Sequence, residues 1–417
     1  MNTQHVNAYP QGRRFSFQSI AKKAVLSQLK ALHTGTLSII DNGQTYRFGN
    51  DNNADLIAEL HVNDASCYVD IMTGGSIGAA ESYMTGDWST PDLAKLVRLM
   101  VRNMDILDGM EGGFAALSKP ALKVLHRMNQ NTEKGSKRNI AAHYDLGNDF
   151  FEAFLDSSMM YSSAIFPTKE SSLEEAQQFR LKRICEQLQL SDQDHVVEIG
   201  TGWGGFAIYA ATHYGCKVTT TTISKEQYAL ACERVRAAGL EDKITLLLED
   251  YRNLEGTFDK LVSIEMIEAV GWKYYNTYYE TCSRLLKPTG LMLIQAITIA
   301  DQRYDRARKD VDFIQRYIFP GSCIPSITAL TQAMRDSSDL RMVSQFDFAE
   351  HYARTLSAWN ETCKREKAKI TELGYSETFQ RMWEFYLCYC EGGFAERSIG
   401  VSHLVYAKPE FRDEAVV

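Results

Sequence analysis

One short segment, residues 197–205, constrains this chain more than any other. A strand sequence, Val197-Glu198-Ile199, leads into a turn with four glycines and then into a helical sequence. Glycines let the backbone approach a ligand closely, and the N-terminus of the following helix favours negative charge. A purely structural turn can have the same composition, so the flanking segments must decide whether a ligand binds here.

The chain after residue 140 alternates between apolar strands and helices. The segments that suit strands are 195–200, 217–223, 244–250, 260–267 and 291–299, and helical sequences include 173–188 and 225–239. Such alternation is typical of a parallel sheet with helices on both faces. We therefore predict an α/β fold with a Rossmann-like, mostly parallel, doubly wound sheet.

The first part of the chain has a different pattern, which predicts a small α+β domain. The expected elements are a helix over 17–33, a hairpin over 35–49 around Asp41-Asn42-Gly43, strand sequence over 59–74, and helical sequences over 81–88 and 92–104. We place this domain at 1–117, a basic linker at 118–139 and the α/β domain at 140–417.

Composition excludes several classes of function. No run of about 18 apolar residues occurs, whereas a membrane-spanning helix needs about 20. The net charge of −8 argues against a dedicated nucleic-acid binder. Nine cysteines without a CxxC pair disfavour a zinc site and a disulfide framework, so we expect reduced thiols and no metal. The absence of an apolar signal-peptide core favours a cytoplasmic protein.

The glycine-rich turn has two interpretations. As G-x-G-x-x-G it can hold a dinucleotide, and as E-x-G-x-G-x-G it resembles motif I of S-adenosylmethionine (SAM) methyltransferases. A dinucleotide site requires an acid about 20 residues further on, to bind the ribose. Here that place holds the four threonines Thr219 to Thr222. Their presence counts against NAD, and it departs from most SAM methyltransferases as well.

That departure and the flanking motifs indicate one family. The motifs are GGSIGAAESYMTGDW (74–88), HYDLGNDFFEAFLD and MMYSSAIF (143–166), VVEIGTGWGGFA (196–207), TISKEQ (222–227), EDYRNL (249–254), EMIEAVG (265–271), LLKPTG (285–290), IFPGSCIPS (318–326), HYARTLSAW (351–359) and FYLCYCEGGF (385–394). In this order the chain resembles bacterial cyclopropane fatty acid synthases and the related mycolic acid methyltransferases over nearly all of residues 35–408.

The resemblance implies SAM as the cofactor and a role for each part of its site. Tyr161 and Ser162 would contact the amino-acid part of SAM, and Gly200, Gly202 and Gly204 would line its backbone cradle. Thr222 and Gln227 would contact the ribose and carboxylate, and Tyr251 and Arg252 would flank the adenine. Thr222 and Gln227 would thus replace the missing acid.

The resemblance also implies a reaction. A cis double bond in an unsaturated phospholipid acyl chain attacks the SAM methyl group, a carbocation develops, and loss of a proton closes a cyclopropane ring. The base would be a bound bicarbonate in an apolar, water-poor site where fixed dipoles act strongly. Its expected surroundings are Glu268, Tyr352, the backbone at Ser163 and Ile297, and the region of Cys390.

Two positions depart from the family pattern. Ser163 replaces the usual Cys, which is tolerable because this position is expected to contribute mainly its amide. Gln295 replaces the usual His, and an amide hydrogen-bonds an anion but cannot become cationic near neutral pH. Methyl transfer without ring closure, giving a methyl-branched or methylene product, therefore remains an alternative. A non-catalytic lipid-binding homologue is a third.

Two basic segments suggest contact with a membrane. The predicted helix 17–33 has lysines beside its apolar face, formed by Ile20, Ala24, Leu29 and Leu32, and the stretch 118–139 has six Lys/Arg with Glu133 as its one acid. Amphipathic basic helices lie in anionic interfaces. We expect a peripheral protein on the inner face of the cell membrane, and family members can form homodimers.

Overall fold

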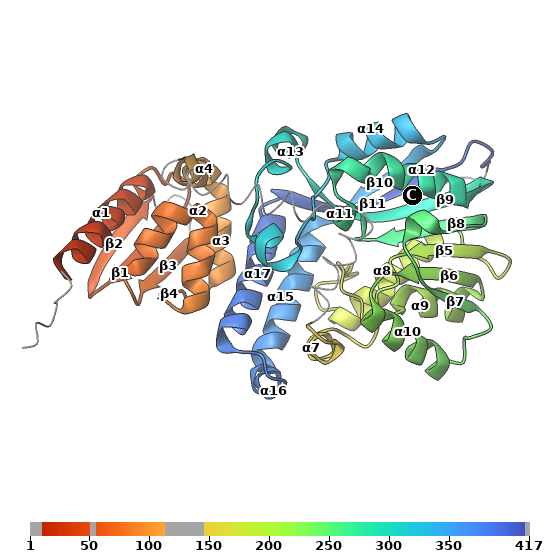
Figure 1. Ribbon diagram of the computed structural model, residues 1–417, viewed down its shortest axis with the longest axis horizontal. Coiled ribbons are helices and arrows are strands. Elements are labelled where there is room, and N and C mark those ends of the chain that lie inside the picture. Colours follow the sequence, from red (N-terminus) through yellow and green to blue (C-terminus); the bar gives the residue numbers. More distant parts are fainter. Residues whose placement is uncertain (1–10, 51–55, 113–145, 413–417) are drawn as a thin grey trace, which may run out of the picture. The chain divides into compact units, whose positions relative to one another are not determined.

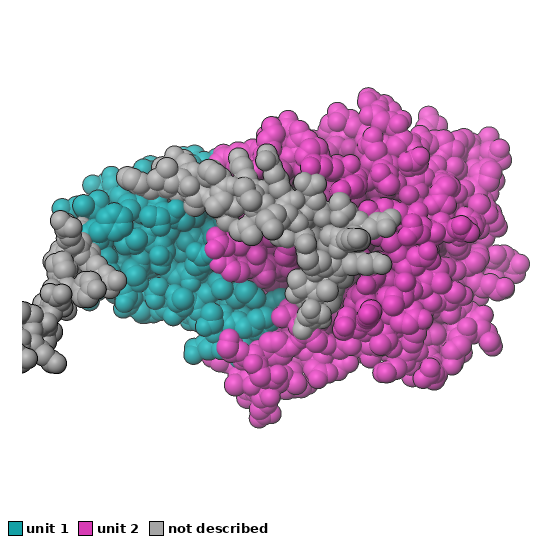
Figure 2. All heavy atoms as spheres, in the orientation of Figure 1, with its two compact units in different colours: residues 1–121, 377–385 teal, residues 122–376, 386–417 magenta. Residues whose placement is uncertain are grey.

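The structure is a computed structural model that describes residues 11–50, 56–112 and 146–412. The chain forms two compact units, one of residues 1–121 and 377–385 and one of residues 122–376 and 386–417 (Figure 2). The predicted boundaries at 117 and 139 lie outside the described residues, as does the basic stretch 118–139, so that division stays a prediction.

The first unit contains a four-stranded sheet in the order β2-β1-β3-β4 (Figure 1). Its elements are α1 (Gln11–Leu29), β1 (Thr36–Asp41), β2 (Gln44–Gly49), β3 (Ile57–Val62), α2 (Ser66–Thr85), β4 (Trp88–Ser89), α3 (Leu93–Arg102) and α4 (Met104–Gly112). The predicted hairpin is confirmed: Asp41 pairs with Gln44, and Asn42 and Gly43 both have positive φ, as a two-residue hairpin turn requires.

Two predictions for this unit are wrong in detail. The strand expected over 59–74 ends at Val62, and helix α2 follows it. Cys67, Ile77 and Ala80 are buried positions of this helix. Near the end of α1, Leu29 and the following Leu32 are buried as predicted. Earlier in the helix the buried positions are Ala21 and Val25 rather than Ile20 and Ala24, and Ile20 is 57% exposed.

The second unit is built on a seven-stranded sheet in the order β10-β11-β9-β8-β5-β6-β7 (Figure 1). Its strands are β5 (His195–Ile199), β6 (Lys217–Thr222), β7 (Ile244–Leu248), β8 (Phe258–Ile264), β9 (Leu286–Ile299), β10 (Arg341–Asp347) and β11 (Ile399–Ala407). Strands β5 to β9 pair in parallel, while β11 pairs antiparallel with both β9 and β10. The predicted α/β fold is confirmed.

Helices and short turns connect these strands. They are α7 (Asn148–Glu152), α8 (Leu173–Gln187), α9 (Gly205–Tyr214), α10 (Lys225–Ala237), η2 (Tyr251–Asn253), α11 (Ile267–Val270), η3 (Trp272–Tyr274), α12 (Tyr275–Leu285), α13 (Asp301–Ala307), η4 (Ile314–Ile318), α14 (Ile327–Ser337), α15 (Ala349–Arg365), α16 (Lys367–Glu372) and α17 (Glu377–Ala395). The first residues of α17 belong to the first unit and its remainder to the second.

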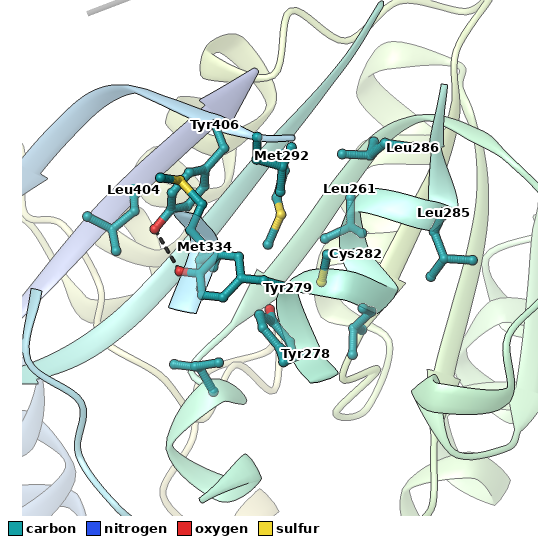
Figure 3. Packing of buried hydrophobic residues seen from close by; sticks show 14 of the residues in the cluster. Leu261, Tyr278, Tyr279, Cys282, Leu285, Leu286, Met292, Met334, Leu404 and Tyr406 are labelled. Carbon is teal, nitrogen blue, oxygen red and sulfur yellow. Dashed lines mark hydrogen bonds between the residues drawn. The ribbon is translucent and has the colours of Figure 1, made fainter. Parts of the chain in front are cut away.

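Apolar side chains of the central strands pack against the helices to form the core. In one cluster Tyr278 and Tyr279 of α12 lie beside Met292 of β9, and the hydroxyl groups of Tyr279 and Tyr406 share a 2.8 Å hydrogen bond (Figure 3). This bond satisfies two buried polar groups that would otherwise destabilise the core. The packed sheet holds the carboxyl ends of β5, β6 and β8 at one edge, where ligands of such folds bind.

Candidate active site

The turn between β5 and α9, residues 200–205, is named here the cofactor loop. The N–H groups of Gly200 and Thr201 both donate to the carbonyl of Thr221, at 3.1 and 3.0 Å, which joins the loop to β6. Gly200, Gly202 and Gly204 have positive φ, and a Cβ at Gly205 would lie 2.6 Å from the carbonyl oxygen of Ser158. The loop thus needs its glycines both for conformation and for close approach.

Thr222 and Gln227 lie together beside this loop. The Thr222 hydroxyl donates to Oε1 of Gln227 at 3.0 Å, and both side chains are buried. Ser224 caps α10 by accepting from the Gln227 N–H at 3.2 Å, so the start of the helix fixes the amide in place. The structure therefore brings the two proposed replacements for a ribose-binding acid together at the end of β6.

Tyr251 and Arg252 follow β7 in the short turn η2. Arg252 binds the buried carboxylate of Asp250 through Nε at 2.8 Å and Nη2 at 2.6 Å, so its charge is already paired within the protein. Burial raises the pKa of Tyr251 above its ordinary value and keeps its hydroxyl protonated. At this turn an aromatic base would therefore pack against the apolar parts of Tyr251 and Arg252.

Tyr161 and Ser162 precede α8. The Tyr161 hydroxyl shares a 2.8 Å hydrogen bond with the hydroxyl of Tyr386. The Ser162 hydroxyl is buried and has no hydrogen-bond partner among the described residues. Buried polar groups are almost always paired, so an orphan hydroxyl at this place fits a polar group of a ligand. Together with the cofactor loop, these residues fit SAM.

A second cluster, named here the anion centre, consists of Glu265, Glu268, Gln295, Tyr352 and the N–H of Ser163. Glu265 is in its middle. Its Oε1 accepts from the Ser163 N–H at 2.9 Å and from Gln295 Nε2 at 2.6 Å, and its Oε2 accepts from the Tyr352 hydroxyl at 2.6 Å. The donors come from three separate segments and converge on one carboxylate.

Gln295 is held in a single orientation by its neighbours. Its Oε1 accepts from Arg180 Nη1 at 3.2 Å and lies 3.0 Å from Nε2 of His403, while its Nε2 donates to the Ser163 carbonyl and to Glu265. Burial lowers the pKa of Arg180 to about 10, so the guanidinium is still charged at neutral pH. A buried cation on the oxygen side directs the amide nitrogen toward Glu265.

Glu268 occupies the start of α11, and burial with the nearby charge of Glu265 raises its pKa to about 8. Its Oε1 accepts a short hydrogen bond from the Ile297 N–H, and its Oε2 is buried without a partner among the described residues. The two backbone groups predicted to serve an external anion are thus engaged by Glu265 and Glu268.

Tyr352 and Cys390 complete the predicted set. The Tyr352 ring stacks on Phe394 of α17 with centroids 4.3 Å apart, and burial raises the pKa of its hydroxyl well above its ordinary value. Burial likewise raises the pKa of the Cys390 thiol, so Cys390 is not a thiolate near neutral pH. Tyr352 thus belongs to the anion centre through its hydrogen bond to Glu265, whereas the Cys390 thiol carries no charge there near neutral pH.

Three residues of this site escaped the sequence-based prediction. Glu265 belongs to a quoted motif but was given no role, and Arg180 and His403 were not considered. A signal for Arg180 did exist. The buried stripe of α8 includes Ala176, Leu181 and Ile184, and Arg180 interrupts it with a charge. A cation on the apolar face of a helix has to have a buried partner.

The sheet order, the antiparallel β11 and the cofactor loop define a SAM-dependent methyltransferase fold. The chain is similar to the structure of mycolic acid cyclopropane synthase CmaA1 in complex with SAH and CTAB, with a TM-score of 0.61 and 28% identity over 65% of this chain and 98% of that one. Residues 131–404 match the family described as mycolic acid cyclopropane synthetase. The chain belongs to this family and is a SAM-dependent methyltransferase.

Two relatives with known names cover most of the chain. The tuberculostearic acid methyltransferase of Mycobacterium tuberculosis is 38% identical over 77% of this chain and 76% of its own length. The cyclopropane-fatty-acyl-phospholipid synthase of Escherichia coli K12 is 37% identical over 84% of this chain and 88% of its own length. By their names, these two relatives make different products.

Proposed function

We propose that the protein transfers a methyl group from SAM to the cis double bond of unsaturated fatty acyl chains in phospholipids and closes a cyclopropane ring. The anion centre beside the cofactor loop carries this proposal. An alkene that attacks a methyl group becomes a carbocation, and a carboxylate held by fixed donors stabilises that charge where water is excluded. The named activity of the Escherichia coli relative supports the same reaction.

SAM, when bound, supplies an electrophilic methyl group on a sulfonium. The chain's own residues would bind and orient it: the cofactor loop would hold its polar part, the buried Ser162 hydroxyl would hydrogen-bond to it, and the Thr222–Gln227 pair would contact the ribose. The carboxylate of Glu265 then lies on the side of the cofactor loop where β8 ends. With SAM and an acyl chain bound, this arrangement would bring negative charge close to the reacting carbon atoms.

Bicarbonate does not fit the position that the resemblance gives it. The Ser163 N–H and the Tyr352 hydroxyl donate to Glu265, and the Ile297 N–H donates to Glu268. A free anion there would lack these donors and would add a further negative charge beside two buried carboxyl groups, which is costly. No step of the reaction is therefore assigned to bicarbonate.

A second product class is favoured by one observation. Gln295 carries no charge, and its amide is fully used by Arg180, His403, Ser163 and Glu265. The relative named as a tuberculostearic acid methyltransferase is similar over three quarters of the chain. The alternative function is methyl transfer that ends in a methylene or methyl-branched chain without ring closure.

The decisive assay uses labelled SAM and vesicles of a cis-monounsaturated phospholipid. Ring closure and methylene formation both add CH₂, so mass alone does not separate them, and NMR of the extracted lipid has to detect the ring protons. We expect release of S-adenosylhomocysteine and cyclopropane signals. Olefinic methylene signals would establish the alternative, and no release with any unsaturated lipid would refute the proposed transfer.

We also infer that α1 docks the enzyme on an anionic membrane at the inner face of the cell membrane. Phe17 and Ile20 are 48% and 57% exposed one turn apart, and exposed Lys23 follows one further turn along the same face. Among the described residues no helix is both long and apolar enough to cross a bilayer. The stretch 118–139 lies outside the described residues and stays a prediction.

Co-sedimentation with anionic vesicles tests this docking. The double variant Phe17→Ser/Ile20→Ser should lose most of its vesicle binding, and wild-type binding should weaken at high salt because the lysines contribute. Leu373→Ser is the matched control, since Leu373 is an exposed apolar residue of the other unit. Equal binding of the double variant and wild type would refute a role for α1.

A further inference from the structure

Glu265 occupies the place that an external base was expected to fill. Its carboxylate receives hydrogen bonds from the Ser163 N–H, the Gln295 amide and the Tyr352 hydroxyl, at 2.9, 2.6 and 2.6 Å. The family resemblance places all three of these donors at the bicarbonate site, with Gln295 in place of the usual His. A carboxylate has the same shape and charge at its two oxygen atoms as that anion, so it can satisfy the same donors.

We propose that Glu265 is the proton acceptor of the reaction, a catalytic residue of the chain itself that makes a bound bicarbonate unnecessary. This inference rests on the proposed function, because it assigns the base of that reaction. The inference goes beyond the proposed function by predicting that turnover is independent of bicarbonate.

The backbone places this carboxylate beside the cofactor. Glu265 directly follows β8 and has a φ of 49°, a left-handed conformation that is uncommon outside glycine. Its N–H donates to the Gln295 carbonyl at 2.8 Å, which fixes that conformation to β9. The next residue, Met266, lies so close to the cofactor loop that a Cβ on Gly200 would be 3.4 Å from its own Cβ. Strain of this kind often marks a functional position.

The electrostatic surroundings favour a carboxylate that ionises and yet remains basic. Burial raises the pKa of Glu265, while the hydrogen bonds from Tyr352, Ser163 and Gln295 and the charge of Arg180 act in the opposite direction. Glu268, whose pKa is itself raised to about 8, is a second buried acid that interacts with it. A base whose pKa lies nearer to the working pH is a better proton acceptor.

The proton can be followed atom by atom. The alkene π electrons form a bond to the SAM methyl carbon as its S–C bond breaks, which releases S-adenosylhomocysteine and leaves a carbocation. A C–H bond of the new methyl group then breaks, its electron pair closes the ring, and Oε2 of Glu265 takes the proton. Oε1 already accepts two hydrogen bonds, whereas Oε2 accepts one and keeps a lone pair. Glu265 later returns the proton to solvent.

Binding of ¹³C-labelled bicarbonate, followed by NMR, tests the occupancy of the site without turnover. The wild type should bind none at a concentration that saturates the Glu265→Ala variant, because that variant frees the donors. Glu280→Gln, at an exposed position on α12, is the control and should behave as the wild type does. Saturable binding by the wild type would overturn the proposal, whether or not the protein turns over lipid.

Turnover in CO₂-free buffer tests the role of the base. Wild-type kcat should not change when bicarbonate is added, and Glu265→Gln should lower kcat by about 10²- to 10⁴-fold with SAH binding retained. Glu265→Ala should be equally slow and should regain activity with added bicarbonate or formate. Wild-type activity that requires bicarbonate, or a Glu265→Gln variant with normal kcat, would contradict the assignment. A wild type inactive on every unsaturated lipid would refute the proposed function instead.

Discussion

The cofactor loop and the anion centre lie at the same edge of one sheet, because β5 and β8 pair in parallel and end there together. The cofactor loop consists of consecutive residues, and its geometry is set by glycine backbone and by one neighbouring strand. The anion centre is assembled from side chains far apart in sequence around buried charges. The first tolerates changes that preserve backbone shape, whereas the second depends on every charge having its partner.

The largest expected effect follows from removing the cation behind the anion centre. Arg180→Met leaves Gln295 without its charged donor and Glu265 without a compensating charge, which should lower the free energy of unfolding by about 3–5 kcal/mol. Urea unfolding measures it. Arg335→Met is the control, because Arg335 is 71% exposed, and should change stability by less than about 0.5 kcal/mol. Equal losses in the two variants would remove the contrast drawn here.

The cofactor loop should respond to lost space rather than to lost charge. Gly205→Ala places a methyl group 2.5 Å from the Met160 sulfur and 2.6 Å from a carbonyl oxygen, so we expect a loss of about 1–3 kcal/mol and weaker SAM binding. In the control Gly239→Ala the new methyl group meets nothing within 4 Å, although φ is 65°. It should cost about 1 kcal/mol and leave SAM affinity unchanged in calorimetry. Wild-type SAM affinity in Gly205→Ala would show that the loop relaxes freely.

The same difference explains what the sequence could predict. The sheet, the hairpin and the glycine-rich turn depend on local patterns, such as Asn42-Gly43 and the glycines after Ile199, and the structure has all three, while the role of the turn in binding SAM stays a prediction. The anion centre depends on contacts across more than a hundred residues, such as that of Arg180 with Gln295. Local patterns hold no record of such contacts. Glu268 and Tyr352 were reached only through the family resemblance, and Glu265 was missed because its partners were unknown.

Gln295 offers a moderate perturbation of the anion centre. A neutral imidazole has one donor and one acceptor, whereas the amide makes four contacts with its neighbours. Gln295→His should therefore lower kcat about tenfold, the effect of losing one or two hydrogen bonds. Gln193→His, at an exposed position, is the matched control in the lipid assay. Unchanged or faster ring formation would show that the amide merely stands in for a histidine.

The smallest effect compares one buried acid from each region. Burial raises the pKa of Glu198, on β5 before the cofactor loop, to about 8, and burial together with Glu265 does the same for Glu268. Between pH 4.3, roughly the ordinary pKa of a glutamate carboxyl, and about pH 8, these two carboxyls are protonated in the folded protein but ionised in the unfolded chain. Stability therefore falls as pH rises toward 8 and the loss is complete above it.

Urea unfolding at pH 7 and 8 isolates these two groups from histidines, whose ordinary pKa is about 6.5. Each acid should contribute about 1 kcal/mol of the decrease, which Glu198→Gln and Glu268→Gln should remove separately. Because Glu265 is a cause of the shift at Glu268 but not at Glu198, Glu265→Gln should reduce only the part that Glu268→Gln removes. Each single variant should therefore keep about half of the wild-type decrease, and a decrease that remains undiminished in both would mean that neither carboxyl is protonated in the folded state at pH 7.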